Sequence, residues 1–334
     1  MAALRVLYAG SPEASARTLE LLLAEAAPRG FEICGALSNP PSARGRHKTP
    51  EATAVAALAE RNGLPVFTPE HLDASCRVEI AAVRPDILVC FAYGRIFGPK
   101  FMALFPYGGL NLHPSALPKY RGCTPVNAAI LNRDAATAFC VQTISLAMDE
   151  GDIVAEHAVP LTGKETAGTL LDAAAEQGAV LLATVLQTVA RTKQRPQGRM
   201  QTGAASYTTV ITKENAKIDW AKSAEEIDAA VRAYSPTPGA WTTENGAALK
   251  IIAGHAVSAD CSFAKEAHTD AGATKNTAAP CGTVCGINRA EGILICCGRG
   301  LYAVTQLQRQ GKKAAGFKEF MNGARSFVGT VLGR

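Results

Sequence analysis

Apolar runs alternate with amphipathic stretches along the first half of the chain, and this alternation predicts strands and helices in turn. Apolar runs predict strands at 4–10, 31–39, 64–68, 86–94, 109–113 and 138–148. Helical periodicity predicts helices at 12–27, 50–62, 74–83 and 166–192. Such alternation is typical of a mainly parallel sheet covered on both faces. We therefore expect an α/β, doubly wound, Rossmann-like domain over residues 1–190.

The pattern changes in the second half. Residues 191–208 have little apolar periodicity, and they predict a basic linker. Beyond it, a short helix at 224–234 precedes strand-like runs at 240–246, 248–254, 282–288, 292–298 and 301–307. Short strands separated by turns predict a small, OB-like β-barrel, which we place in a C-terminal domain over residues 209–334.

Composition narrows the class of protein. The 334 residues are 48% hydrophobic and 19% charged, as in an ordinary globular protein. The first apolar run is too short for a signal peptide, and no later run is expected to span a bilayer. Ten cysteines in a chain without an export signal indicate reduced thiols, so we expect a cytoplasmic protein with no membrane contact.

Four cysteines in the second half have spacings that suggest a zinc site: Cys281, Cys285, Cys296 and Cys297. The last two are adjacent in a predicted strand, so their side chains would point to opposite faces. We therefore expect no metal, and we interpret these residues as small buried hydrophobes.

Polar side chains stand where two apolar strands end. Asn111 and His113 are alternate residues, so they share one face of their strand. A later apolar run leads to Asp149, and Gly151 permits a tight turn there. Ligands of open α/β sheets bind beyond the carboxyl ends of the strands, so we expect the amide, imidazole and carboxylate to meet in one crevice. Spacing alone also allows a structural Asn–His pair and an ordinary turn.

The chemistry that needs these three groups is acyl transfer to a nucleophile supplied by a substrate, such as an amine. The sequence contains no Gly-x-Ser-x-Gly elbow and no cysteine with an evident base. Asn111 would donate to the oxyanion, an interaction commonly worth about 3–4 kcal/mol. His113 would handle the proton, and Asp149 would hold the imidazole.

The same residues belong to a longer motif. The run NLHPSALP at 111–118, with YRG at 120–122 and DEGD at 149–152, resembles the signature of the folate-dependent formyltransferases. Shorter matches resemble the branch of that family that acts on methionyl initiator tRNA, and the resemblance covers nearly the whole chain. They are YAGSP at 8–12, AYG at 92–94, KIDW at 217–220, RAYSP at 232–236 and GKK at 311–313.

The resemblance implies the reaction and its partners. The donor would be 10-formyltetrahydrofolate, and the acceptor would be the α-amino group of methionyl initiator tRNA. The product would be N-formylmethionyl-tRNA for translation initiation, and a monomer is expected. Folate contacts are implied at Phe91, Tyr93, Gly94, Ser115, Ala116, Leu117, Pro118 and Asp152. The first turn lacks Gly-x-Gly-x-x-Gly, so no dinucleotide is expected there.

Charge placement agrees with an RNA partner. The formal net charge is +5, and residues 191–222 carry seven Lys or Arg against two acids. Residues 306–318 carry four cations and no acid, the kind of cluster that phosphates neutralise. Ser42 stands where an arginine of the family aligns, so Arg44 and Arg46 become candidates. The expected tRNA contacts are Arg44, Arg46, Lys48, Arg199, Arg309, Lys312 and Lys313.

Three alternatives remain at this point. The same chemistry could act on a small amine, such as glycinamide ribotide or an amino sugar. A folate-binding hydrolase could release formate without any acceptor. A non-catalytic RNA-binding module would not need Asn111 at all.

Overall fold

The computed structural model describes residues 2–44, 49–257 and 279–334. Contacts divide the chain into two compact units. Unit 1 comprises residues 1–129, 135–161 and 169–209, and unit 2 comprises 130–134, 162–168 and 210–334. Residues 193–209, which follow the last helix of unit 1, belong to that unit.

Unit 1 is built on one seven-stranded sheet, in the order β10-β9-β7-β6-β1-β2-β5. Five strands are parallel, while β9 runs antiparallel to β7, and β10 antiparallel to β9. The predicted mainly parallel, Rossmann-like sheet is confirmed. The strands are β1 (Leu4–Gly10), β2 (Phe31–Leu37), β5 (Val66–Phe67), β6 (Ile87–Phe91), β7 (Gly109–His113), β9 (Ala136–Thr143) and β10 (Ile153–Pro160).

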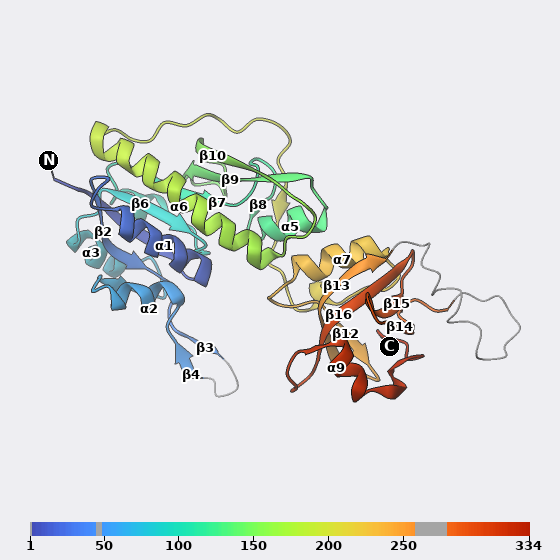
Figure 1. Ribbon diagram of the computed structural model, residues 1–334. Coiled ribbons are helices and arrows are strands. Elements are labelled where there is room, and N and C mark those ends of the chain that lie inside the picture. Colours follow the sequence, from blue (N-terminus) through green and yellow to red (C-terminus); the bar gives the residue numbers. More distant parts are fainter. Residues whose placement is uncertain (1, 45–48, 258–278) are drawn as a thin grey trace, which may run out of the picture. The chain divides into compact units, whose positions relative to one another are not determined.

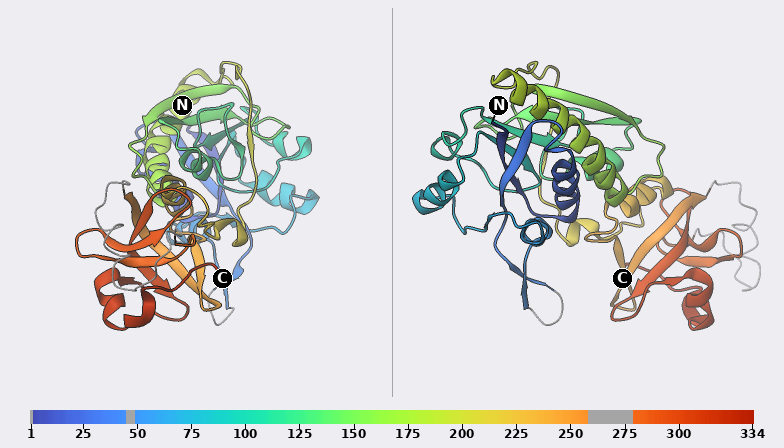
Figure 2. Two further views of the ribbon diagram at one scale, coloured as in Figure 1. Left: turned by 90° about the vertical axis from the view of Figure 1, so that its right-hand side faces the viewer. Right: turned by 60° about the vertical axis from the view of Figure 1, so that its left-hand side comes forward.

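Helices cover both faces of this sheet, which explains why its strands are apolar at nearly every position. On β1, Leu7 packs in a cluster with residues of α3 and α4, whereas the Tyr8 hydroxyl donates to Ser15 of α1 on the other face. Helices α1 and α6 lie side by side (Figures 1 and 2). The helices are α1 (Glu13–Glu25), α2 (Ala54–Arg61), α3 (Ala74–Ala82), α4 (Pro99–Met102), α5 (Pro125–Leu131) and α6 (Ala167–Thr192).

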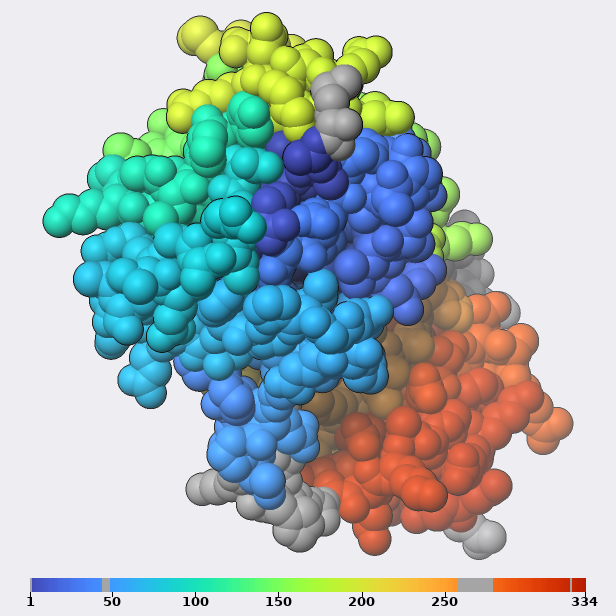
Figure 3. Space-filling view, turned by 90° about the vertical axis from the view of Figure 1, so that its left-hand side faces the viewer, coloured from blue at the N-terminus to red at the C-terminus, as the bar shows by residue number. Residues whose placement is uncertain are grey.

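The start of α2 differs from the predicted helix at 50–62. Thr53 caps the helix by accepting a hydrogen bond from the backbone N–H of Ala56. Such a cap fixes the first turn, so the residues before it are free to pair as a strand. They form β4 (Thr49–Glu51), which pairs with β3 (Ser42–Arg44) in a hairpin that projects from unit 1 (Figures 1 and 3).

Helix α6 corrects one expectation. By length and composition this 26-residue helix is apolar enough to cross a membrane, although no such segment was predicted. Half of the most apolar 18-residue stretch of this helix is buried within the protein, and the side chains of Leu182 and Leu186 are fully buried. Gly178 lies directly over Leu112 of β7, where an added Cβ would come within 2.3 Å of the leucine. Its apolar character is that of a core helix lying on the sheet.

Unit 2 contains a six-stranded antiparallel sheet in the order β12-β13-β16-β15-β14, with β17 pairing to β16. In the described residues β12 and β14 do not pair, so the sheet is a curled half-barrel (Figure 2). The predicted barrel-like second domain is confirmed in this form. Its elements are α7 (Ala224–Ala233), β12 (Trp241–Glu244), β13 (Ala247–Val257), β14 (Val284–Asn288), β15 (Gly292–Cys296), β16 (Leu301–Arg309), β17 (Ala315–Gly316) and α9 (Phe317–Asn322).

Candidate active site

The predicted amide and imidazole share one face of β7. Asn111 is paired in register with Cys90 of β6 on one side and with Gln142 of β9 on the other. Leu112, which lies between Asn111 and His113 in the strand, is buried against α6 on the opposite face of the sheet. The alternation of the strand therefore directs Asn111 and His113 to the same side of the sheet, as the sequence predicted.

The carboxylate arrives by a different route from the one expected. Strand β9 ends at Thr143 instead of continuing to residue 148, and it is antiparallel to β7. Asp149 therefore lies in the loop between β9 and β10, not at the carboxyl end of a parallel strand. It adopts a positive φ of 55°. Two residues on, Gly151 lies so close to Thr143 that an added Cβ would be 1.6 Å from the Thr143 carbonyl oxygen.

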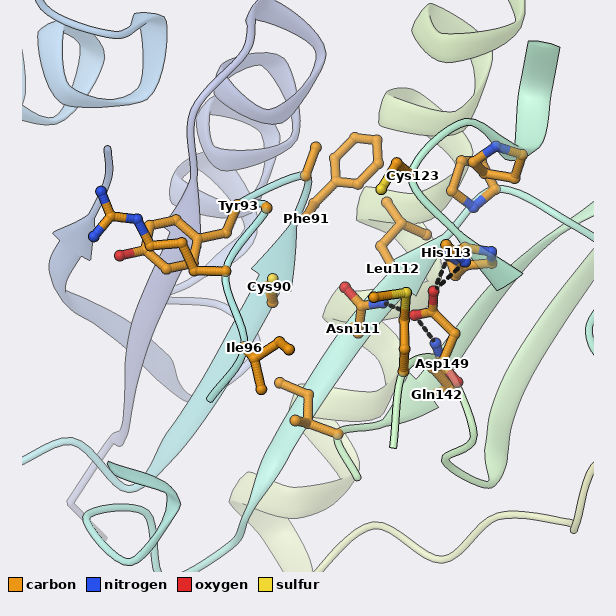
Figure 4. Close-up of a pocket in the computed structure, with 18 of the residues that line it drawn as sticks. Cys90, Phe91, Tyr93, Ile96, Asn111, Leu112, His113, Cys123, Gln142 and Asp149 are labelled. Carbon is orange, nitrogen blue, oxygen red and sulfur yellow. Dashed lines mark hydrogen bonds and ion pairs between the residues drawn. The ribbon is translucent and has the colours of Figure 1, made fainter. Parts of the chain in front are cut away.

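Hydrogen-bond donors surround the Asp149 carboxylate (Figure 4). Its Oδ1 accepts from Asn111 Nδ2 at 3.2 Å and from Gln142 Nε2 at 2.8 Å. Its Oδ2 accepts from the backbone N–H of Gly122 at 2.7 Å and lies 3.5 Å from His113 Nδ1. Three donors, two side-chain amides and one backbone N–H, thus fix the position of the carboxylate.

His113 is 4% exposed, and its two ring nitrogens have different partners. Nε2 lies 2.9 Å from the Tyr120 carbonyl oxygen, which can only accept, so Nε2 carries the proton. Nδ1, facing Asp149, is then the proton acceptor of the neutral ring. Burial lowers the pKa of His113, while Asp149 and the Tyr120 carbonyl act in the opposite direction. The side chain is therefore held neutral at physiological pH and can take up a proton.

Asn111 has donor capacity left for a ligand. Its amide carries two N–H groups, and the contact to Asp149 uses one of them. Asn111, His113, Gln142 and Asp149 all line a single cavity of about 410 Å³. That volume is typical of a small-molecule site, and much of the remaining wall is apolar. The apolar wall includes Phe91, Ile96, Phe97, Val126, Leu146 and Met148.

The predicted folate contacts divide into two groups. Phe91, Tyr93 and Gly94 line the cavity, with the Tyr93 ring stacked on Phe97 at 5.5 Å. The others are not among the residues that line it, and their contact with folate stays a prediction: Ser115, Ala116, Leu117, Pro118 and Asp152.

The reason is that the chain after His113 turns inward. Ser115 is fully buried, and its hydroxyl donates to the Lys119 carbonyl. Leu117 packs with Cys140 and Ile153 in a small core cluster. Ser115 and Leu117 therefore support the site through core packing.

The predicted tRNA contacts are placed as follows. Arg199 pairs with Glu156, and Arg309 pairs with Glu244, so both guanidinium groups already have carboxylate partners. Lys312 and Lys313 are exposed in the turn between β16 and β17, and neither forms an ion pair within the described parts of the chain. Arg46, Lys48 and the side chain of Arg44 lie outside the described residues.

Sequence reasoning missed two glutamines. Gln142 is 1% exposed within the apolar strand β9, and a buried amide among apolar neighbours was the available signal. Gln201 lies on the segment after α6 and bonds to the backbone carbonyls of Asp149 and Gly151. No local pattern marks it, because its partners are 50 or more residues away.

Within the described residues, no cluster of three or more His, Cys, Asp or Glu could hold a metal ion. The four cysteines were expected to be buried, but only Cys297 is: Cys285 and Cys296 are partly buried, and Cys281 is exposed. Burial raises the pKa of Cys297 to about 12, as expected for a thiol packed in a core.

The chain resembles known proteins along its whole length. It matches the family described as "Formyl transferase" over residues 4–186 and the "Formyl transferase, C-terminal domain" over residues 210–325. The methionyl-tRNA formyltransferase of Treponema denticola is 40% identical, over 97% of this chain and 98% of that protein. That of Treponema pallidum is 37% identical, over 98% of this chain and 99% of that protein.

A solved structure supports the fold. HypX from Aquifex aeolicus, in complex with tetrahydrofolic acid, superposes with a TM-score of 0.60 at 14% identity. The alignment covers 98% of this chain and 48% of HypX. The resemblance seen in the motifs is confirmed by the two family matches and by the full-length relatives. The chain therefore belongs to the formyl transferase family, and within it to the group of the methionyl-tRNA formyltransferases.

Proposed function

We propose that this protein transfers the formyl group of 10-formyltetrahydrofolate to the α-amino group of methionyl initiator tRNA, and that Asn111, His113 and Asp149 carry out the transfer. The observation that carries the proposal is the convergence of these three side chains on one cavity, through direct contacts with one another. Relatives named methionyl-tRNA formyltransferase match the chain from end to end, which favours the same acceptor here.

Asn111 stabilises the charge that develops on the formyl oxygen. The acceptor amine attacks the formyl carbon, so the carbonyl oxygen becomes an oxyanion. The second N–H of the Asn111 amide donates to this oxygen, while the first remains on Asp149. A preorganised donor of this kind is one of the larger single contributions to acyl transfer.

His113 moves the proton. The new bond joins the amine nitrogen to the formyl carbon, and the bond that breaks joins this carbon to N10 of the folate. The amine must lose a proton and N10 must gain one. Neutral His113 accepts the first proton and returns it to the departing nitrogen. The imidazolium formed in between is stabilised by the Asp149 carboxylate, 3.5 Å from Nδ1.

The apolar side of the cavity suits the donor. Phe91, Ile96 and Phe97 give a wall against which a flat pterin ring can lie. Burial raises the pKa of the Cys90 thiol to about 12, so this cysteine carries no thiolate at neutral pH. Cys90 is therefore not a nucleophile in the proposed transfer, in which the formyl group passes directly from folate to amine.

Unit 2 carries features that suit the acceptor RNA. The Trp241 ring lies beneath two cations, with Lys213 Nζ at 5.1 Å and Lys217 Nζ at 5.6 Å from its centroid. Aromatic rings beside cations are common in nucleic-acid binding surfaces. Lys312 and Lys313 add exposed positive charge on the same unit. We assign initiator tRNA and tetrahydrofolate as partners of a monomeric cytoplasmic enzyme.

The decisive experiment supplies 10-formyltetrahydrofolate with a labelled formyl group to the full-length protein. Charged initiator tRNA should become labelled, whereas charged elongator tRNA, glycinamide ribotide and an amino-sugar nucleotide should not. Labelling of a small amine in preference to initiator tRNA would assign the protein to small-molecule formylation. Release of formate in the absence of any acceptor would assign it to hydrolysis.

A further inference from the structure

The segment that follows α6 returns to the active site and places one side chain against the loop that carries Asp149. Gln201 Nε2 lies 2.7 Å from the Asp149 carbonyl oxygen and 2.8 Å from the Gly151 carbonyl oxygen. Its Oε1 accepts from Arg121 Nη2 at 2.8 Å and Nε at 3.1 Å. Residues 149–151 are called the Asp149 turn below. Gln201 bridges the two ends of this turn and Arg121 beside it.

The Asp149 turn needs such support. Asp149 has a positive φ, which is uncommon for a residue with a Cβ, although Asp adopts it more readily than most. Gly151 is packed against Thr143 with no room for a side chain. The carbonyl oxygens of Asp149 and Gly151 both receive the Gln201 amide, so one side chain determines how this turn presents its carboxylate.

Gln201 also contacts a second amide. Its Nε2 lies 3.2 Å from Gln142 Oε1. With its oxygen facing Gln201, Gln142 presents its Nε2 to Asp149 Oδ1 at 2.8 Å. The opposite orientation would set the Gln142 oxygen against the carboxylate, where two acceptors repel each other. The longer contact from Gln201 therefore supports the Gln142 orientation that the Asp149 carboxylate itself favours.

We propose that Gln201 is a positioning residue for formyl transfer, acting through the Asp149 turn and through Gln142 to fix the Asp149 carboxylate relative to His113. The proposal rests on the proposed function, because Asp149 matters to catalysis only if the transfer occurs at this site. Loss of the partners of metal-binding side chains commonly changes activity about 10- to 100-fold, and we expect an effect of that order here.

A purely structural role would be anchoring of the segment, and other contacts already provide this. Before Gln201, Arg199 and Ile153 exchange two backbone hydrogen bonds of 2.9 Å. After it, β11 (Tyr207–Thr208) pairs with β8 (Arg121–Gly122). None of these bonds involves the Gln201 side chain, so the segment should remain in place when that side chain changes.

The test compares three full-length variants in the formyl-transfer assay. Gln201→Leu removes both the donor and the acceptor at similar length. Gln201→Glu keeps an acceptor for Arg121 but loses the donors to the turn and to Gln142. Gln197→Leu is the matched control, because Gln197 is an exposed glutamine of the same segment without a hydrogen bond from its side chain in the described residues.

We expect Gln201→Leu and Gln201→Glu to lower kcat per folded molecule about 10- to 100-fold, with KM for both substrates close to that of Gln197→Leu. In a variant that already carries Asp149→Asn, Gln201→Leu should not lower kcat further, because the carboxylate that Gln201 positions has been removed. The pH profile gives an independent readout. Asp149 raises the pKa of His113 against the effect of burial, so a displaced carboxylate should move the acid limb of kcat to lower pH.

The possible results distinguish a failure of the positioning role of Gln201 from a failure of the proposed function. If wild-type protein formylates initiator tRNA and Gln201→Leu retains the kcat of the Gln197→Leu control, the positioning role is wrong. It is also wrong if kcat falls only in proportion to a loss of folded protein, with the acid limb unmoved. Absence of transfer by the wild-type protein would instead overturn the proposed function itself.

Discussion

Replacing Asn111 by alanine tests the oxyanion role most directly. The substitution removes both N–H groups of the amide. One of them contacts Asp149 Oδ1 at 3.2 Å, and the other is assigned to the formyl oxygen. The two losses must be separated, because either could lower activity.

A matched variant makes this separation possible. Gln142 Nε2 donates to the same oxygen of Asp149, at 2.8 Å. Gln142→Leu therefore removes a donor to Oδ1 without removing the donor to substrate. The ratio of activities between Gln142→Leu and Asn111→Ala isolates the contact to the formyl oxygen.

The expected magnitude follows from these contacts. Loss of one oxyanion donor costs about 3–4 kcal/mol in the transition state, so Asn111→Ala should fall about 10²- to 10³-fold below Gln142→Leu in kcat. Stability should change little, because Asp149 keeps its bonds to Gln142 and to the Gly122 N–H. A net loss of about 1 kcal/mol would lower the Tm of a domain of the size of unit 1 by roughly 2–4 °C.

The assay is single-turnover formylation of charged initiator tRNA by excess enzyme at saturating folate, which isolates the chemical step from product release. Tm and near-ultraviolet circular dichroism establish that both variants are folded. Equal losses in Asn111→Ala and Gln142→Leu would refute the reasoning, since Asn111 would then act only through Asp149.

Four further outcomes are expected. Gly151→Ala should destabilise the protein by about 3 kcal/mol in urea unfolding and abolish transfer, because its Cβ would meet a backbone carbonyl oxygen. The pKa of His113 is lowered by burial, so kcat/KM should stay constant above its ordinary value of 6.5 and fall only on further acidification. Cys123→Ser should retain kcat within about threefold, because direct transfer needs no thiol in the cavity. A double change of Lys312 and Lys313 to Ser should raise KM for tRNA and reduce the salt slope of binding by about 1.4–1.8.

Each expectation has a contrary result. A glycine with open space and a negative φ, Gly98, provides the control for Gly151, and equal destabilisation by both would remove the packing argument. A fall of kcat/KM that begins above pH 6.5 would mean that His113 is not the group that titrates.

The free energy of unfolding should also decrease as pH falls below 6.5, because the unfolded chain then binds a proton that the buried His113 ring does not readily bind. Loss of activity in Cys123→Ser would favour a covalent intermediate, and an unchanged salt slope would remove Lys312 and Lys313 from the RNA surface.

The sequence by itself determined the framework of this protein. Continuous apolar runs such as β1 and β6 are buried on both faces, and the period of two in β7 fixed the shared face of Asn111 and His113. These features are local, because side-chain direction in a strand follows from backbone geometry alone. The motif around them was sufficient to indicate the family.

Only the tertiary structure decided how the carboxylate reaches the amide and the imidazole. The antiparallel direction of β9, the positive φ of Asp149 and the supporting role of Gln201 all depend on contacts between distant parts of the chain. The same is true of Ser115 and Leu117, which are buried by packing against distant parts of the chain. A loop takes its shape from the surfaces that satisfy its backbone polar groups, and those surfaces exist only after the chain has folded.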